Sequence, residues 1–449
     1  MPSEAGGASG LPGVDFESWL LKFDKRGACA SPKTRDALLA RLQAVPQTPV
    51  ILFSHGWNNE FGDATALYAA FLRHLQAHFE AGAPGPRRPL FVGVVWPSTW
   101  LSWDQGPRIA AAASGDAADG AERALQQELA EALPDEVARE RLHRLFGLPR
   151  LTREQGAELA RLVSSALGAM LTQEGGDGAE AAAPDPGTVL SGLEALQGLA
   201  PAASDGGGDE LGGGGTIDGG SRRPPQHAGA LAFLDPRGAL RLASVYQMKD
   251  RAGTVGWHGV SRLIDDILAT SKAPLHTVGH SYGAKVVLSA IAAATAARQV
   301  ETVLLLQPAV SHLGFAAEVP GREGGGGYRT VPAKVKRAIL ATYSAHDFPL
   351  HTVFHRALRR EDDLGELRIA GGATTAGHPP SPYAALGGYG PRGAGERLVD
   401  PMPDPGARID MPGGPLVVGI DGTGGRRVGG HGDVATPHTA WLLYLQMTA

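Results

Sequence analysis

Ser281 stands at the centre of Gly279-His280-Ser281-Tyr282-Gly283, which matches the pattern Gly-x-Ser-x-Gly. An apolar run before it predicts a strand, and the Ala-, Val- and Leu-rich segment Ala284–Ala297 predicts a helix. A serine at this kind of strand-to-helix turn projects its hydroxyl from the carboxyl edge of the sheet, where it can attack a carbonyl carbon. The flanking glycines leave room for neighbouring backbone, and the helix N-terminus favours nearby negative charge. The alternative is a turn without chemistry, because 63 glycines make chance matches easy.

A serine hydroxyl is a poor nucleophile unless a base lies within hydrogen-bond reach and an acid orients that base. With this type of turn the acid follows the serine in the chain and the histidine follows the acid. Asp347 ends the apolar run Arg337–Asp347, two predicted strands after Ser281, and is therefore the predicted acid. Asp421 is the nearest rival. An aspartate at such a position also commonly caps a turn or a helix.

The predicted base is His431, which lies in a loop between the last predicted strand and the terminal helix Pro437–Met447. A loop at that place can hold an imidazole over the serine. His438 is the alternative, but it follows Pro437 directly and is expected inside the first helical turn. Asp433 is expected to hold or cap the loop.

Acyl transfer places negative charge on the substrate's carbonyl oxygen, and two backbone N–H groups typically stabilise it. The residue after the nucleophile, Tyr282, is expected to supply one N–H group. The other is expected from Trp57, in the loop after the first strong predicted strand, with Asn58 as the fallback. His55 lies in the same loop, but no second His, Cys or Asp accompanies it at ligand spacing, so no metal site is predicted.

These residues need a sheet whose carboxyl edge brings their loops together, and the apolar pattern predicts one. Several short runs are apolar without alternation, which is typical of strands buried on both faces of a parallel sheet. Helical patterns fall between several of them, which indicates an α/β fold with a mostly parallel, doubly wound sheet. The runs are Pro49–Glu60, Pro89–Ser98, Ala273–Ser281, Val300–Ala309, Arg337–Asp347 and Pro415–Gly422; the helical patterns are Ala64–His78, Gly259–Thr270 and Ala284–Ala297.

The segment 105–236 interrupts this rhythm and is predicted to be an insertion between two parts of the core, 1–104 and 237–449. Its first half reads as helices, with Thr152 and Gln155 forming a capping box. Its second half, 173–227, is so rich in glycine that we expect disorder or a mobile loop. The insertion is a candidate lid over the site or a surface that meets lipid, although helices packed at the edge of the sheet are the simpler interpretation.

The bulk composition favours no special partner. The chain has 449 residues and a formal net charge of −5, which gives no argument for nucleic acid or an anionic membrane surface. Cys29 is the single cysteine, so the fold needs no oxidising compartment. The first fifteen residues lack a signal-peptide pattern, and no apolar run approaches the roughly 20 residues of a membrane span. The expected location is the cytoplasm.

The stretches "SHGWNN", "GHSYG", "YSAHD" and "GGHGD", in this order, resemble the oxyanion loop, nucleophile elbow, acid loop and histidine loop of the α/β-hydrolase superfamily. The stretch "VYQMKDRAGTVGWHGVSRLI" also resembles the helix before the elbow in an uncharacterised bacterial subgroup of serine hydrolases. The resemblance covers Thr48–Ser102 and Arg241–Ala449 and leaves out the insertion. It implies an α/β-hydrolase fold and a serine hydrolase without cofactor.

The expected function is therefore cleavage of a carboxylic ester, from a small molecule or a lipid, through an acyl-enzyme on Ser281. The residues leave open a lipase, a thioesterase or an amidase. They also leave open a protein of another class, in which the same scaffold binds a partner without catalysis.

Overall fold

The computed structural model describes most of the chain. The described residues are 8, 10–57, 59, 61–81, 87–98, 115–174, 184–197, 234–320, 324–354, 379, 381, 383–409, 414 and 416–448.

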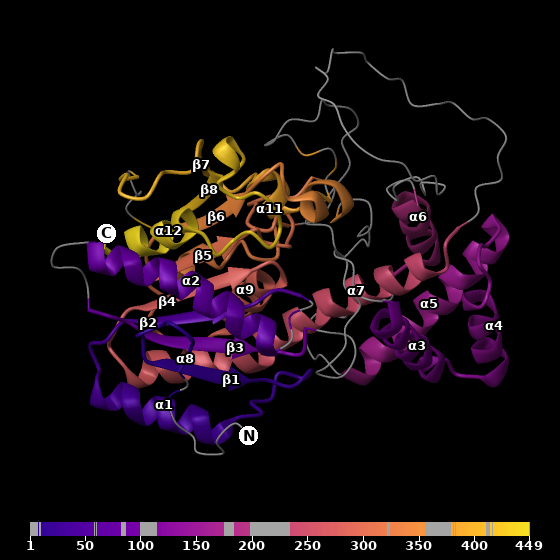
Figure 1. The fold of residues 1–449 in the computed structure, drawn as a ribbon, viewed down its shortest axis with the longest axis horizontal. Coiled ribbons are helices and arrows are strands. Elements are labelled where there is room, and N and C mark those ends of the chain that lie inside the picture. The colour runs from indigo at the N-terminus through magenta and orange to yellow at the C-terminus, as the bar shows by residue number, and fades with distance from the viewer. Residues whose placement is uncertain are drawn as a thin grey trace, which may run out of the picture.

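One eight-stranded sheet organises these residues, and every described strand pairing is parallel. The strand order is β1-β3-β2-β4-β5-β6-β8-β7, and the strands point the same way in Figure 1. The bounds are β1 Ser18–Lys22, β2 Val50–Ser54, β3 Leu90–Val95, β4 Leu275–His280, β5 Thr302–Leu306, β6 Ile339–Tyr343, β7 Arg397–Val399 and β8 Val417–Asp421.

The six strands expected from continuous apolar runs are all confirmed. They are apolar throughout because helices cover both faces of the sheet, so consecutive side chains enter two different cores. In β2, Val50 and Leu52 belong to one core while Ile51 and Phe53 belong to the other. Two strands were not expected: β1, and the short edge strand β7, which falls in a stretch rich in glycine and proline.

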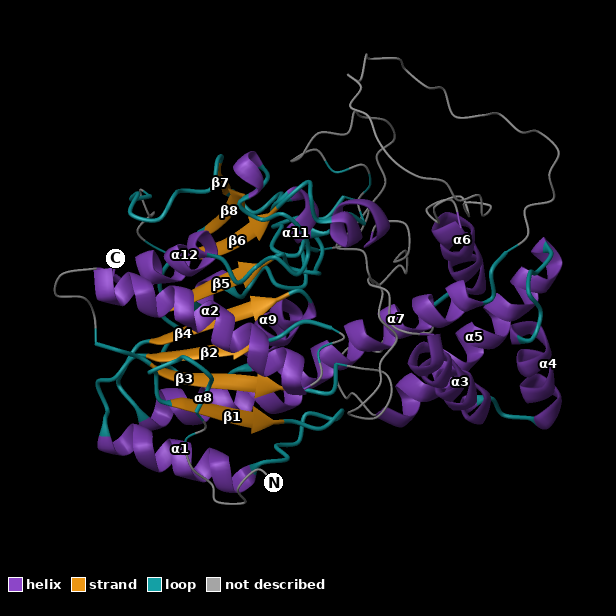
Figure 2. Cartoon of the chain, viewed as in Figure 1, coloured by secondary structure: helices purple, strands orange, loops and turns teal. Residues whose placement is uncertain are grey.

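The helices form two layers around the sheet (Figure 2). On one face, side chains of α2 and α12 share a core with the strands, and on the other face α1, α8 and α9 do so. A π-helical segment, Gly256–Val260, joins α7 to α8. The bounds are α1 Pro32–Ala44, α2 Phe61–Ala81, α7 Arg237–Val255, α8 Ser261–Thr270, α9 Tyr282–Ala293, α11 Leu386–Tyr389 and α12 Pro437–Thr448.

In the described part of the chain, four further helices lie beyond the carboxyl ends of the strands, and α7 runs between them and the sheet (Figure 1). The expected capping box opens α5: the Thr152 N–H donates to Gln155 Oε1 at 2.8 Å and the Gln155 N–H donates to Thr152 Oγ1 at 3.3 Å. The expectation of disorder or a mobile loop over 173–227 is wrong for α6 and for the last two residues of α5, whereas 175–183 and 198–227 lie outside the described residues. The bounds are α3 Gly115–Ala132, α4 Glu136–Phe146, α5 Arg153–Glu174 and α6 Pro186–Gln197.

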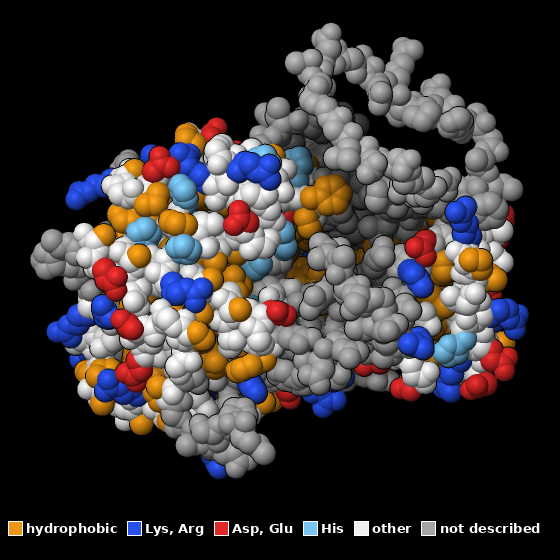
Figure 3. All heavy atoms as spheres, viewed as in Figure 1, with side chains coloured by type: hydrophobic (Ala, Val, Ile, Leu, Met, Phe, Trp, Pro, Cys, Tyr) orange, Lys and Arg blue, Asp and Glu red, His pale blue; other side chains and the backbone are white. Residues whose placement is uncertain are grey.

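Acidic and basic side chains are interspersed over the visible described surface in Figure 3. This distribution agrees with the small net charge of −5. Within the described part of the chain, no helix combines the length and the apolar character that crossing a membrane would require.

Candidate active site

Ser281 occupies the turn between β4 and α9 in a strained backbone conformation. Its φ is +55° and its ψ is −124°, a combination that costs a non-glycine residue about 1–3 kcal/mol and persists only where the surroundings impose it. The turn is held from the neighbouring strand, because the Ser281 N–H donates to the Leu306 carbonyl at 3.1 Å and the Ser281 carbonyl accepts from the Ala309 N–H at 3.2 Å. The side chain is therefore fixed at the carboxyl edge of the sheet.

A close approach between α9 and β2 requires Gly283. A Cβ atom built on Gly283 would lie 2.1 Å from the Ser54 carbonyl oxygen and 2.4 Å from the His55 carbonyl oxygen. No side chain fits there without movement of the backbone. The last glycine of Gly-x-Ser-x-Gly thus lets the serine turn settle against the end of the adjacent strand.

Three side chains from distant parts of the chain form one hydrogen-bonded series. His431 Nε2 lies 2.8 Å from Ser281 Oγ, and His431 Nδ1 lies 2.8 Å from Asp347 Oδ2. A carboxylate only accepts, so Nδ1 carries the proton and Nε2 is left to accept the serine hydroxyl proton. The structure brings together the three residues that the sequence predicted as nucleophile, base and acid.

The Asp347 carboxylate is fully buried at the end of the loop after β6. Its Oδ1 accepts the Leu350 N–H at 3.0 Å, and its Oδ2 accepts the Gln307 side-chain amide at 2.9 Å in addition to His431. A buried charge is tolerated when hydrogen bonds replace its lost hydration. The aspartate is held in place on both oxygens.

The loop that carries His431 is tied down through its backbone. His280 Nε2 donates to the His431 carbonyl at 2.9 Å, and Asp433 Oδ2 accepts the Gly429 N–H at 2.9 Å. The Ser344 hydroxyl donates to the Val428 carbonyl at 2.8 Å. About a quarter of the His431 side chain remains accessible, 25%, so the imidazole is positioned without being sealed in.

The pKa values of the two adjacent histidines move in opposite directions. Burial favours neutral His431, but the charge and hydrogen bond of Asp347 outweigh burial and raise its pKa above 6.5. Burial, together with the nearby His431, lowers the pKa of His280 to about 3. His280 therefore stays neutral and keeps donating to the loop, while the Asp347 carboxylate favours the protonated form of His431.

The loop after β2 lies directly against the serine. A Cβ atom built on Gly56 would be 2.7 Å from Ser281 Cβ, and the ring centroids of Trp57 and Tyr282 are 6.4 Å apart. Asn59 Nδ2 donates to the carbonyls of Gly56 and Trp57 at 3.1 and 3.0 Å. The two residues expected to supply oxyanion donors are thus neighbours beside Ser281; the fallback, Asn58, lies outside the described residues.

His55 supports this loop as a buried structural residue. Its ring stacks on Trp96 with a centroid distance of 5.7 Å and an interplanar angle of 13°. His55 Nδ1 donates to the Gly56 carbonyl at 2.9 Å, and its Nε2 accepts the Trp96 N–H at 3.3 Å. Burial lowers the pKa of His55 to about 4, so the ring is neutral.

The rival acid and base have other roles. The Asp421 carboxylate accepts the Thr423 N–H at 2.8 Å and so closes the turn after β8. His438 is the second residue of α12, as expected, and its Nε2 lies 3.3 Å from Asp404 Oδ1. Both contacts are structural.

Sequence reasoning missed two residues around the triad, Gln307 and His280. Gln307 is the polar residue that directly follows the buried strand β5, and this position at the carboxyl edge was the only available signal. His280 is the variable position before the serine, where the Gly-x-Ser-x-Gly pattern prescribes no residue type.

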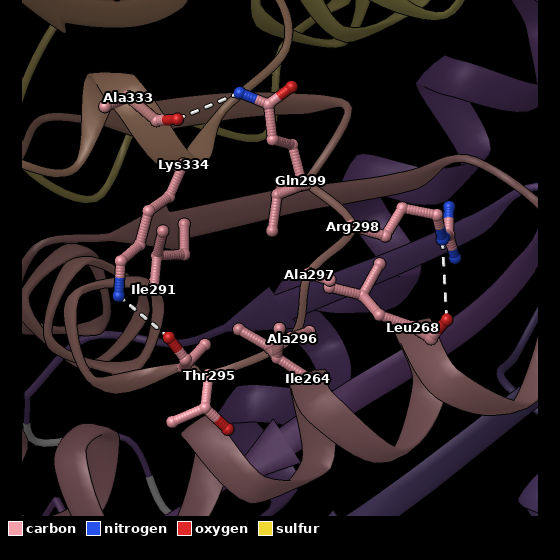
Figure 4. Close-up of a pocket in the computed structure, with 12 residues that line it drawn as sticks. Ile264, Leu268, Ile291, Thr295, Ala296, Ala297, Arg298, Gln299, Ala333 and Lys334 are labelled. Atoms are coloured by element: carbon pink, nitrogen blue, oxygen red, sulfur yellow. Dashed lines mark hydrogen bonds between the residues drawn. The ribbon is translucent and has the colours of Figure 1, made fainter.

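A hollow of about 480 Å³ lies near the other end of the strands, between the C-terminal ends of α8 and α9 and the start of β5 (Figure 4). Its two cations cap helix ends. Lys334 Nζ donates to the Ala292 and Ala294 carbonyls at 2.6 and 2.8 Å, and Arg298 donates to the Leu268 carbonyl at 3.4 Å. These bonds explain the hollow's charges without a ligand.

Comparison of the chain with protein-family models, with curated proteins and with solved structures finds no match in any of the three. What the chain does has therefore to be inferred from the geometry of its own residues.

Proposed function

We propose that this chain is a serine hydrolase with an α/β-hydrolase fold, and that it cleaves carboxylic esters. The observation that supports this most strongly is the series Ser281–His431–Asp347, with 2.8 Å at both contacts and a strained serine backbone at its head. Strain of this kind is typical of functional sites, because selection for stability alone would remove it. The chain order serine, acid, histidine is also that of α/β-hydrolases.

In the first step His431 Nε2 takes the Ser281 hydroxyl proton as Oγ forms a bond to the substrate's carbonyl carbon. The carbonyl π-electrons move onto oxygen and give a tetrahedral oxyanion. Asp347 keeps its negative charge throughout and stabilises the imidazolium that forms. Because the three groups are already in contact, little reorganisation precedes attack.

The backbone N–H groups of Tyr282 and Trp57 are the proposed donors to the oxyanion. Removing one such donor typically costs a factor of 10² to 10³ in kcat, or about 3–4 kcal/mol. The intermediate collapses when His431 gives its proton to the leaving alkoxide, which departs as an alcohol. Water then attacks the acyl-enzyme with His431 as base, and the acid product and free Ser281 are released. No cofactor takes part in these steps.

The choice of an ester substrate is an inference by analogy. The triad alone does not identify the substrate, because thioesterases, amidases and lipases use the same three groups. The helices α3–α6, beyond the carboxyl ends of the strands, are the proposed lid or lipid-contacting element over the site. A small-molecule or lipid ester and a cytoplasmic location complete the proposal.

The test is labelling with a fluorophosphonate probe, followed by assay on p-nitrophenyl esters of increasing chain length. Wild type is expected to label and to hydrolyse at least some of the esters, whereas Ser281→Ala does neither. Equal labelling of the two proteins would reject the hydrolase and favour a binding protein on the same scaffold. Activity that does not rise above the critical micelle concentration of a long-chain ester would argue against a lipase.

A further inference from the structure

Gln307 has a positive φ of 43° in the turn directly after β5. It is fully buried, and a bulky non-glycine residue in this region is strained. Near the triad it shares this feature with Ser281. The surroundings must therefore impose this backbone conformation, which directs the Gln307 side chain toward Asp347.

Hydrogen bonds fix the Gln307 amide in one orientation. Its Nε2 donates to Asp347 Oδ2 and to the Gly387 carbonyl, both at 2.9 Å. Its Oε1 accepts the Thr342 hydroxyl at 2.9 Å, and that hydroxyl oxygen accepts the Gln307 N–H at 2.9 Å. A flipped amide would face acceptors with its oxygen and the hydroxyl proton with its NH₂ group, so only one orientation satisfies every partner.

We propose that Gln307 is a positioning residue that aims the Asp347 carboxylate at His431. This inference rests on the proposed function. Asp347 Oδ2 receives two donors, His431 Nδ1 at 2.8 Å and Gln307 Nε2 at 2.9 Å, while Leu350 N holds the other oxygen. Without the amide, the carboxylate can rotate about its Cβ–Cγ bond and the hydrogen bond that orients His431 becomes longer and less linear. The Gln307 side-chain amide forms hydrogen bonds with Asp347, Gly387 and Thr342, and of these partners only Asp347 belongs to the triad, so the amide acts on the triad through Asp347.

Gln446 on α12 provides a matched control. It is also a buried glutamine, and its Nε2 donates to the Val303 and Ala338 carbonyls at 3.0 Å each. Val303 is the second residue of β5 and Ala338 directly precedes β6, so both partners are backbone carbonyls near the amino ends of these strands, whereas the triad lies at the carboxyl edge. Replacing either glutamine by methionine keeps the length of the side chain and removes one buried amide.

The first experiment compares Gln307→Met with Gln446→Met by steady-state kinetics on the best p-nitrophenyl ester and by thermal unfolding. Both variants are expected to lose stability. Gln307→Met alone is expected to lose about 10- to 100-fold in kcat with KM within twofold of wild type, as small displacements of catalytic groups do. Thr342→Val is expected to lower kcat in the same direction, and the double variant to be no slower than Gln307→Met, because the threonine acts through the amide.

The second experiment uses Gln307→Glu and the pH dependence of kcat/KM. The protonated carboxyl of Gln307→Glu donates to Asp347 Oδ2 as the amide does, whereas an ionised one repels the Asp347 carboxylate. This repulsion raises the pKa of the introduced carboxyl. The ratio of variant to wild-type activity is therefore expected to fall as the pH rises. Among the described residues, His431, His280 and His351 are the titratable groups on which the Asp347 charge acts. Burial lowers the pKa of the last two, so both are neutral above pH 7.

The inference is overturned if Gln307→Met loses no more kcat than Gln446→Met, or if the Gln307→Glu ratio does not change with pH. Its failure differs from that of the proposed function. If only Gln307 is wrongly assigned, wild type still labels with fluorophosphonate in a Ser281-dependent way. If the proposed function is wrong, wild type labels no more strongly than Ser281→Ala.

Discussion

His431 Nε2 lies 2.8 Å from Ser281 Oγ although 150 residues separate the two in the chain. The serine follows β4 and the histidine follows β8, and in the sheet β5 and β6 lie between these strands. The histidine loop must therefore reach back across two strands. His280 meets the loop there and binds the His431 carbonyl, so the residue before the nucleophile also holds the base.

The first prediction concerns the acid limb of the pH–rate profile. The proposed base must be neutral to accept a proton, and Asp347 raises its pKa above 6.5 against the effect of burial. The kcat/KM value is thus expected to rise with pH and to reach half its plateau above pH 6.5. Asp347→Asn removes both causes that raise the pKa, so its limb moves to lower pH while kcat falls about 10⁴-fold. A limb that Asp347→Asn leaves in place would show that another group titrates.

The first prediction has a second part, because the raised pKa of His431 also makes the stability of the protein depend on pH. A folded-state pKa raised above the unfolded value stabilises the protein at pH values below the unfolded pKa, and this contribution is lost as the pH rises through the folded pKa. His431 therefore contributes most to stability where the proposed catalysis is weakest. Urea titrations of wild type and His431→Ala at pH 5.5 and pH 8 measure this, and the difference between the proteins is expected to be larger at pH 5.5.

The apolar pattern was sufficient to predict six of the eight strands and the motif-bearing turns. Buried parallel strands are apolar on both faces, and the Gly-x-Ser-x-Gly turn needs glycine for reasons of local sterics. A Cβ atom on Gly283 would clash with the Ser54 carbonyl at the end of β2, a contact that only the fold creates. The motif nevertheless already specifies glycine at this position. Asp347 and His431 could be placed because each follows a strand at the same sheet edge.

Other features depend on contacts that a single sequence does not encode locally. The edge strand β7 has three residues, two of them half-buried and one exposed, so it lacks an apolar run. The helix α6 was hidden because its neighbours in the chain are rich in glycine. The role of Gln307 depends on Thr342 and Asp347, which lie 35 and 40 residues away. Only the folded sheet brings these groups together.

The second prediction tests the strain at the nucleophile. At φ +55° and ψ −124° a Cβ atom is unfavourable, and glycine alone avoids that cost. Ser281→Gly is expected to be more stable than Ser281→Ala by about 1 kcal/mol, because alanine keeps the Cβ atom and both lack the hydroxyl. Urea denaturation at one pH gives the difference. Equal stability of the two variants would mean that the backbone relaxes without cost.

The third prediction concerns the loop expected to bind the oxyanion. A Cβ atom on Gly56 would lie 2.7 Å from Ser281 Cβ, so Gly56→Ala must push this loop away from the serine. We expect kcat/KM to fall about 10²-fold, comparable to the loss of one oxyanion donor. Gly62→Ala is the control six residues away at the start of α2, where nothing lies within 4 Å of the added atom. It is expected to retain activity, and a loss shared by both variants would contradict the assignment.

The fourth prediction separates the anchoring of the histidine loop from burial of a histidine in general. His280→Phe keeps a ring of similar size but removes the donor to the His431 carbonyl. His276→Phe, four residues earlier on the same strand, removes a buried histidine that binds Thr302 instead. Both variants lose a buried hydrogen bond, which costs about 1 kcal/mol of stability. Only His280→Phe also frees the loop that carries the base, so its kcat is expected to fall about tenfold or more while that of His276→Phe stays near wild type. Equal losses in kcat for the two variants would show that His280 acts through the core of the sheet and not through the histidine loop.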